Sequence, residues 1–258
     1  MYRIRDKICC VLLLTALSVF LFVGGRLISL YLEYLHGAQT YEELKKFAKE
    51  PEIDDATNED NVESESPFLQ IDFEGLMAQN PDVVAWIQIP ALDISYPVVQ
   101  GKDNDYYLHH MFNRESNKNG SIFIDYHNKP DFTDSNTIIY GHNMRDGSMF
   151  GTIGKYLDKK LYDQYPCFYI YVPGYVMEYQ IISCYAGKTR SEAYTYRFPT
   201  TDDFKEFISL IRSYAEYSTK TEVDLDDKIV TLSTCVNTRR FYRYLIHGKL
   251  VKRIRNGE

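Results

Sequence analysis

The chain has 258 residues, of which 45% are apolar and 15% aromatic, so it can bury the core of one or two folded domains. The formal net charge is −7, and no long run of Lys and Arg occurs outside the termini. This charge pattern argues against polyanion binding, so nucleic acid is not an expected partner.

The N-terminus predicts a membrane anchor. Basic residues precede "ICCVLLLTALSVFLFVGG", 18 largely apolar residues at positions 8–25, which is long enough to span a bilayer. The preceding positive charge places residues 1–7 in the cytoplasm, residues 8–32 in the plasma membrane, and the rest outside the cell. A cleavable signal peptide is the alternative, but no A-x-A-like site follows and "LISLYL" continues beyond Arg26.

Residues 33–66 are expected to connect this anchor to a folded domain. "TYEELKKFAKE" opens with a capping box, Thr40-x-x-Glu43, and stops at Pro51, which predicts a short stalk helix. From Glu50 to Glu65 the chain is rich in acidic residues and has almost no large apolar one. This composition predicts a flexible, solvated linker.

Residues 67–258 are predicted to form a mainly β domain. A short helix is expected around "FEGLMAQN", and an amphipathic helix at "TDDFKEFISLIRSYAEYS" lies between the sixth and seventh of eight strand-like runs. Eight short strands in under 200 residues predict a barrel or a sandwich. The runs are "VVAWIQI", "ISYPVV", "SIFID", "NTIIY", "CFYIYV", "VMEYQIISCYA", "KIVTLST" and "FYRYLIHGKLVKR".

The five cysteines do not predict a disulfide framework. Cys9 and Cys10 lie in the membrane segment, and the three that remain, Cys167, Cys184 and Cys235, are an odd number. Cys167 and Cys184 lie on runs that flank the "VPGYV" turn, so they either face each other across a hairpin or pack as free thiols.

Cys235 ends a strand in "IVTLSTCVNTRR". Ile229, Thr231, Ser233 and Cys235 share one face of that strand, and the opposite face is the more apolar one. This argues mildly against a purely structural thiol, although a lone cysteine is more often a small buried hydrophobe. No C-x-x-C pair is present, so no metal site is expected.

A cysteine nucleophile would need an acid or base and a group that stabilises an oxyanion. Among the six histidines, His142 in "NTIIYGHNMRDGSMFG" is placed best, because it follows a strand end. His247 is expected to be a packed or solvent-facing strand residue. Arg243 lies in the last strand, and a hairpin would bring it close to Cys235. The adjacent Arg239 and Arg240 are expected in a solvated turn.

"TLSTC", an Arg eight residues after its cysteine, and the upstream "GHNM-DGSMF" stretch together resemble the class B sortases. These are membrane-anchored cysteine transpeptidases of Gram-positive bacteria. The similarity covers about residues 67–253 and includes both predicted helices of the domain. It implies a closed eight-stranded sortase-type β-barrel with an N-terminal helix, a long helix between strands six and seven, and no cofactor.

The resemblance also implies roles for individual residues. Cys235 would be the nucleophile, His142 the general acid and base, and Arg243 the stabiliser of the oxyanion. The groove for the substrate would include four further residues: Asn104, Leu108, Ser233 and, in a less certain register, Tyr194. Many relatives carry an acidic residue directly after the cysteine, where this chain has Val236.

The implied reaction cleaves a sorting signal of Asn/Ser-Pro-x-Thr-Gly/Asn type after Thr through a thioacyl intermediate. An amine of peptidoglycan or its lipid-linked precursor then accepts the acyl group, which joins a surface protein to the cell wall. The alternatives are a pilin-polymerising sortase with a lysine acceptor, a hydrolytic cysteine peptidase, and a catalytically silent barrel that binds wall peptides.

Protonation constrains such a mechanism. With ordinary pKa values of about 8.5 for a thiol and about 6.5 for an imidazole, independent titration would leave under about 1% of molecules as thiolate and imidazolium at pH 7. Either the pKa values of the two groups shift so that they form an ion pair, or the enzyme works from the small fraction of molecules that hold a thiolate and an imidazolium.

Overall fold

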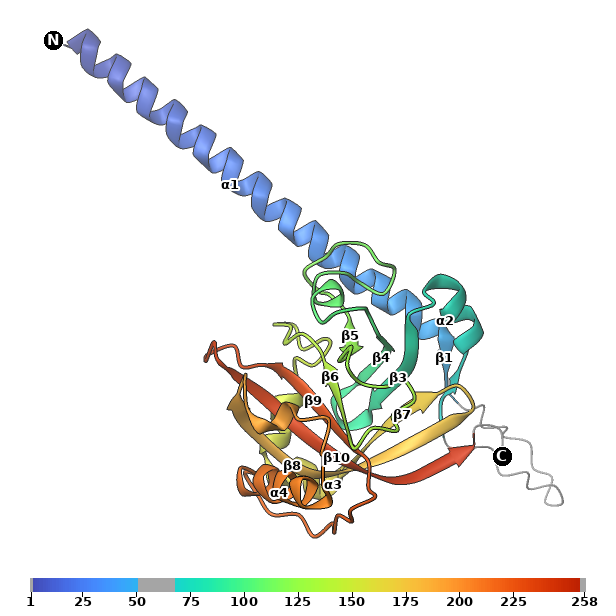
Figure 1. Cartoon of the computed structure of the whole chain (residues 1–258). Coiled ribbons are helices and arrows are strands. Elements are labelled where there is room, and N and C mark those ends of the chain that lie inside the picture. The colour runs from blue at the N-terminus through green and yellow to red at the C-terminus, as the bar shows by residue number, and fades with distance from the viewer. Residues whose placement is uncertain (1, 51–67, 256–258) are drawn as a thin grey trace.

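The computed structural model describes residues 2–50 and 68–255, and its main body is a closed β-barrel (Figure 1). The strands follow one another around the barrel in the order β10-β8-β7-β3-β4-β5-β6-β9. All eight predicted strands are therefore confirmed. Their bounds are β3 (Val83–Ile89), β4 (Ile94–Val99), β5 (Ile122–Ile124), β6 (Asn136–Tyr140), β7 (Cys167–Val172), β8 (Tyr175–Lys188), β9 (Ile229–Cys235) and β10 (Tyr242–Arg255).

The barrel is mixed, because β4 pairs with β5 and β6 pairs with β9 in parallel, whereas the other neighbours are antiparallel. The register of β9 and β10 places Arg243 directly opposite Cys235. The register of β6 and β9 places Tyr140 opposite Ser233. The ends of β6, β9 and β10 therefore meet at one edge of the barrel.

The predicted long helix is α4 (Thr201–Ser213), which follows β8 and precedes β9. Its first turn is closed by a capping box in which Thr200 and Asp203 bond each other's backbone amides. The buried face of the helix packs on Tyr185, Leu245 and Ile229, which belong to strands β8, β10 and β9. Because Ile229 faces α4, the face of β9 that also carries Ser233 and Cys235 is the outer face of the barrel.

The N-terminal helix α1 (Tyr2–Leu44) runs without a break into the domain (Figure 1). The separate stalk helix expected to begin at Thr40 is wrong, because the Thr40 hydroxyl donates to the His36 carbonyl within α1 at 2.9 Å. The physical reason is burial: Tyr41, Leu44 and Phe47 belong to the core of the barrel domain. Packing of these side chains carries the helix past the predicted cap.

Two short strands not expected from the sequence follow α1. A 3-10 turn, η1 (Lys45–Phe47), leads into β1 (Ala48–Lys49), which pairs with β2 (Gln70–Ile71). The acidic linker predicted between them lies almost entirely in residues 51–67, outside the described part of the chain. The remaining helices and turns are α2 (Phe73–Gln79), as predicted, η2 (Pro90–Leu92), η3 (Tyr106–Leu108), η4 (Ile153–Leu157), α3 (Lys159–Gln164) and η5 (Glu192–Tyr194).

Two of the cysteines pack inside the barrel domain as free thiols. Cys167 lies opposite Gln180, and Cys184 lies opposite Ile246, so they do not face each other across the hairpin. Burial raises the pKa of Cys167 to about 12 and that of Cys184 further. Neither thiol is therefore placed to act as a nucleophile at neutral pH.

Candidate active site

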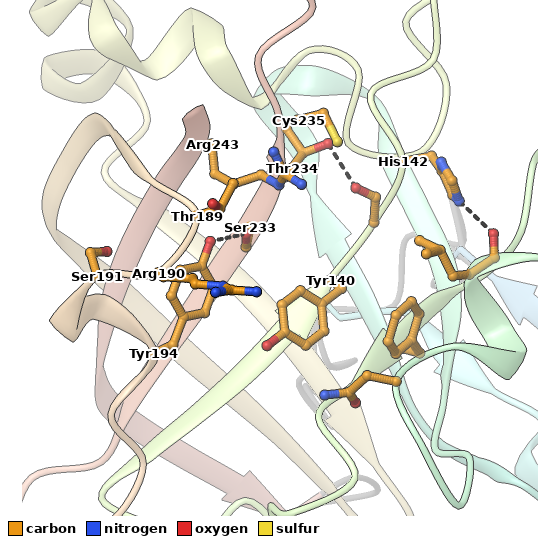
Figure 2. Close-up of a pocket in the computed structure, with 14 residues that line it drawn as sticks. Tyr140, His142, Thr189, Arg190, Ser191, Tyr194, Ser233, Thr234, Cys235 and Arg243 are labelled. Carbon is orange, nitrogen blue, oxygen red and sulfur yellow. Dashed lines mark hydrogen bonds between the residues drawn. The ribbon is translucent and has the colours of Figure 1, made fainter. Parts of the chain in front are cut away.

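A pocket of about 440 Å³ lies over the outer face of β6 and β9. It brings together every residue that the sequence singled out for catalysis or substrate binding. Figure 2 shows Arg243, Cys235 and His142 along one rim, with Tyr194 and Tyr140 across the pocket from them. The predicted residues in its lining are Cys235, His142, Arg243, Asn104, Leu108, Ser233 and Tyr194.

Cys235 is solvent-exposed at the last position of β9. Two bonds tie the end of β9 to the end of β6: the Thr234 hydroxyl donates to the Gly141 carbonyl at 2.7 Å, and the Gly141 amide donates to the Ser233 carbonyl at 3.2 Å. The Asn143 side chain also donates to the Cys235 carbonyl at 2.5 Å. The segment that carries His142 is thus fastened to the segment that carries the thiol.

Val236, where the family resemblance led us to expect an acidic residue, is only 6% exposed. Its backbone amide donates to the Tyr242 carbonyl at 3.1 Å, which joins the two ends of the loop between β9 and β10. The position therefore packs as an apolar residue beside the pocket.

His142 lies just beyond the end of β6, and its ring is largely buried. Its Nε2 is 2.8 Å from the Leu108 carbonyl oxygen. A carbonyl can only accept, so Nε2 carries the proton and the neutral ring keeps its lone pair on Nδ1. Burial lowers the pKa of His142, the bond to Leu108 opposes this in part, and nearby His109 adds to the lowering. Figure 2 shows the hydrogen-bonded edge of the His142 ring pointing away from Cys235.

Arg243 is half-buried on β10, opposite Cys235. Its Nη1 donates to the carbonyls of Tyr242 at 3.0 Å and Arg240 at 3.4 Å. These bonds use one of three guanidinium nitrogens and leave, among the described residues, Nε and Nη2 available to a ligand in the pocket. Arg239 and Arg240 are exposed in the turn, as predicted.

Tyr194 and Ser233 form part of the groove together. The Tyr194 hydroxyl lies 2.9 Å from the Ser233 Oγ, and the ring stacks with Tyr140 at a centroid distance of 6.2 Å. Burial raises the pKa of Tyr194, and the Ser233 bond and the charge of Arg243 partly oppose that. Tyr194 is therefore a neutral, amphipathic wall at physiological pH.

A buried carboxylate behind the groove was missed by the sequence reasoning. Asp125, 5% exposed, accepts hydrogen bonds from the side chains of Asn104 at 2.7 Å, Tyr140 at 2.9 Å and His127 at 2.7 Å. Burial alone would raise the pKa of Asp125, but bonds from these three residues hold it below the ordinary value. Asp125 is the last residue of the predicted run "SIFID" and directly follows β5, so the strand-end criterion that selected His142 could have selected it.

A second buried network supports Tyr194 from behind. His247 is 0% exposed, and its Nδ1 lies 2.9 Å from the Thr231 hydroxyl, which donates to the Asn136 Oδ1 at 2.7 Å. The Asn136 amide donates to the carbonyls of Ala193 and Thr195, on either side of Tyr194. Since Thr231 donates to Asn136, it accepts from His247, and burial lowers the pKa of this histidine to about 3.

No cluster of three or more His, Cys, Asp or Glu side chains that could hold a metal ion occurs among the residues that the structure describes. The pocket offers instead a thiol, an imidazole and a guanidinium within one lining. This is the set of groups that nucleophilic acyl transfer requires.

Comparison with known proteins decides the family. A model of the sortase domain matches residues 87–251. The chain belongs to the sortase family. It is 39% identical over 244 residues to sortase B of Listeria monocytogenes, covering 93% of this chain and 95% of that protein. Sortase B proteins are cysteine transpeptidases, and this sortase is an enzyme of that kind.

Solved sortase B structures share the fold. A sortase B from Bacillus anthracis, in complex with AAEK1, superposes with a TM-score of 0.71 at 32% identity and covers 86% of this chain and 99% of that one. A Staphylococcus aureus sortase B–substrate complex superposes with a TM-score of 0.66 at 31% identity and covers 70% of this chain and 84% of that one. The predicted sortase-type barrel is therefore confirmed.

Proposed function

We propose that this sortase cleaves a sorting signal of Asn/Ser-Pro-x-Thr-Gly/Asn type after Thr and transfers the acyl group to an amine of peptidoglycan or its lipid-linked precursor. The observation that carries the proposal is the single pocket that holds Cys235, His142 and Arg243 beside a groove lined by Tyr194 and Leu108. A related sortase B has been solved as a substrate complex, which supports a peptide in this groove.

In the first half of the reaction the Cys235 thiolate attacks the Thr carbonyl carbon. Arg243, directly across the strand pair, donates hydrogen bonds to the oxygen as negative charge develops on it. The intermediate collapses with cleavage of the C–N bond, and the departing amine takes a proton from His142. A thioester on Cys235 and a neutral His142 remain.

In the second half the acceptor amine attacks the thioester carbonyl. His142 takes a proton from the attacking nitrogen, the C–S bond breaks, and Cys235 leaves as a thiolate. The new amide bond joins the two substrates, and both enzyme groups return to their starting state.

The bond to Leu108 assigns the moving proton to one ring nitrogen. Because Nε2–H of His142 is held by the Leu108 carbonyl, Nδ1 is the atom that gives and takes the proton. The lowered pKa of His142 makes the imidazolium a minority form at neutral pH. The enzyme is therefore expected to turn over slowly from a minor protonation state.

The groove residues are proposed to bind the sorting signal. Leu108 and the ring of Tyr194 offer apolar surface, and Ser233 offers a hydroxyl. Both polar atoms of the Asn104 amide are already bonded, to Asp125 and to the Tyr126 backbone amide. Asn104 is therefore held in one orientation before any substrate binds, which lowers the entropic cost of recognition.

We also propose that the enzyme is a single-pass protein of the plasma membrane with its barrel outside the cell. Among the described residues, one helix near the N-terminus is long and apolar enough to cross a membrane. Large apolar residues in its first part are exposed, among them Leu14 (64%) and Phe20 (73%). The basic residues that precede them favour a cytoplasmic N-terminus.

The test is to incubate the detergent-solubilised full chain with a library of Pro-x-Thr peptides and candidate amines, and to follow products by mass spectrometry. A thioacyl adduct on Cys235 and an amine-dependent product are expected. No adduct with any peptide would overturn the proposal. Hydrolysis without amine transfer would instead identify a peptidase, and transfer only to a lysine side chain would identify a pilin polymerase.

A further inference from the structure

His142 rests against a wall of backbone rather than side chains. Leu108 supplies the carbonyl that holds Nε2, and Gly120 lies beside it. Gly120 has a φ of +54°, and a Cβ there would lie 2.8 Å from Nε2 and 2.7 Å from the Leu108 oxygen. The position of the Gly120 backbone therefore limits where the imidazole can sit.

The two halves of this wall belong to one closed loop, residues 107–121. The Ser121 amide donates to the Tyr107 carbonyl at 2.9 Å, and the Asn117 amide donates to the His109 carbonyl at 2.9 Å. These bonds tie the start of the loop to its end. A displacement of Gly120 would therefore also displace Leu108.

The Tyr41 hydroxyl, on α1, fastens this loop from behind. It donates to the Gly120 carbonyl at 2.6 Å and accepts the Phe112 amide at 3.3 Å. Tyr41 is 6% exposed, and its ring packs edge-on against Tyr96. A short bond from a buried, rigidly packed side chain fixes the position of the Gly120 peptide group.

Other α1 residues contact the same loop and the loop that follows His142. The Glu33 carbonyl accepts from the Asn117 side chain at 3.0 Å. Tyr34 is hydrogen-bonded to Asp146, which raises the pKa of Tyr34 to about 12. The helix therefore contacts both segments between which His142 lies.

We propose that Tyr41 is a positioning residue for His142, acting through Gly120 and Leu108 to hold the imidazole in its buried place. The inference rests on the proposed role of His142 as acid and base. By this inference α1, through Tyr41, contributes to the geometry of the active site.

The variant Tyr41→Phe tests this inference, because it keeps the ring and removes only the hydroxyl. With the Gly120 carbonyl released, water gains access to the ring, and burial should lower the pKa of His142 less than before. A higher pKa would by itself enlarge the imidazolium fraction, but the loss of position of Nδ1 should outweigh this. We therefore expect a net fall in kcat of about tenfold, while KM for the sorting-signal peptide stays within about twofold. The acidic limb of the pH–rate profile should move to higher pH.

Tyr156→Phe is the matched control. Tyr156 is also a fully buried tyrosine, and its hydroxyl donates to a backbone carbonyl, that of Tyr165, at 2.9 Å. It should lose comparable stability and leave the titration of His142 unchanged. Neither variant alters any charged or titratable group around His142. In the pocket these groups are Cys235, Arg243, Arg190, Tyr140 and Tyr194. The loop of residues 107–121 adds Tyr107, His109, His110, Arg114, Glu115 and Lys118, and the segment after His142 adds Arg145 and Asp146.

The decisive readout is the titration of His142 by NMR of ¹³C-labelled histidine in the full chain, assigned with His142→Gln. A higher pKa in Tyr41→Phe than in both the parent and Tyr156→Phe supports the inference. Equal titration in all three overturns it, whatever happens to kcat. This measurement needs no substrate, so it decides the role of Tyr41 even if the parent forms no thioacyl adduct.

Discussion

The two sides of the proposed active site, the nucleophile side with Cys235 and Arg243 and the acid–base side with His142, are built in different ways. Cys235 and Arg243 lie opposite each other in one antiparallel pair, so their relation follows from a single short connection. His142 is held by the carbonyl of Leu108, which lies 34 residues earlier in the chain. The neighbouring Gly120 is in turn held by Tyr41, which lies 79 residues before Gly120. The nucleophile side is thus a product of local pairing, whereas the acid–base side depends on long-range packing.

This difference implies different responses to mutation. On the nucleophile side, the backbone ladder holds the residues whatever their side chains, so a substitution removes chemistry and leaves geometry. On the acid–base side, remote substitutions should change geometry while every reacting group remains present. The following predictions are ordered from the largest expected effect to the smallest.

Arg243→Ala should lower kcat by about 10²–10³-fold, because it removes the donors directed at the developing oxyanion. The melting temperature should change little, since Arg243 is half-buried and, among the described residues, its guanidinium donates to two carbonyls close to it in the chain, those of Arg240 and Tyr242. Steady-state kinetics and thermal unfolding measure the two effects. Arg240→Ala, in the exposed turn, is the control and should keep nearly full activity; equal losses in both variants would refute the assignment.

Gly120→Ala should lower kcat by about 100-fold, because the new Cβ would collide with the His142 ring and the Leu108 oxygen. Gly174→Ala provides the comparison, since Gly174 also has a positive φ, +83°, but a Cβ there would have nothing within 4 Å. Both variants should lose about 1 kcal/mol of stability from backbone strain. If Gly174→Ala loses as much activity, the effect is strain alone.

Asn136→Ala should raise KM for the peptide several-fold and change kcat less, because it frees the carbonyls on either side of Tyr194. Ser183→Ala removes another fully buried polar group, a hydroxyl that donates to the carbonyl of Ile211 in α4. This control should lose stability and keep its KM. An unchanged KM in Asn136→Ala would show that the buried network of His247, Thr231 and Asn136 does not contribute to substrate binding.

The titration of His247 should lower the stability of the fold in acid. Its pKa is about 3 in the folded protein, against about 6.5 for an unfolded imidazole. Between these values the unfolded chain binds the extra proton, so the free energy of unfolding falls as pH drops from about 6.5 toward 3. Urea unfolding across this range should show a shallower decline for His247→Asn, and parallel curves would contradict the expectation.

The same contrast explains what could be predicted from the sequence. The strands could be predicted because their apolar runs are short and bounded by turn residues. The placement of Arg243 opposite Cys235 could be predicted because a hairpin connects their two strands. The position of Val236 in the packed turn and the bond between Tyr194 and Ser233 required the fold. No local pattern specifies such cross-chain contacts.

The length of α1 shows most clearly where prediction from local sequence patterns fails. A capping box at Thr40 is a sound local signal for a helix start, but burial of Tyr41 and Leu44 in the barrel core outweighed it. Asp125 was missed for a related reason: its importance lies in the bonds it accepts from distant Asn104 and Tyr140. Motif resemblance selected the residues that we propose react, and only the fold showed which contacts hold them in place.

The unbroken passage of α1 into the barrel core has a consequence for how this enzyme meets its substrates. A domain on a flexible tether would tumble and sample every orientation. Here the helix continues through Tyr41 into packed contacts with the barrel. In a bilayer the barrel would therefore keep a fixed distance from the membrane surface and a fixed orientation relative to it. If the proposed membrane placement holds, the proposed lipid-linked acceptor would reach the pocket by lateral diffusion in two dimensions, from a direction set by the helix.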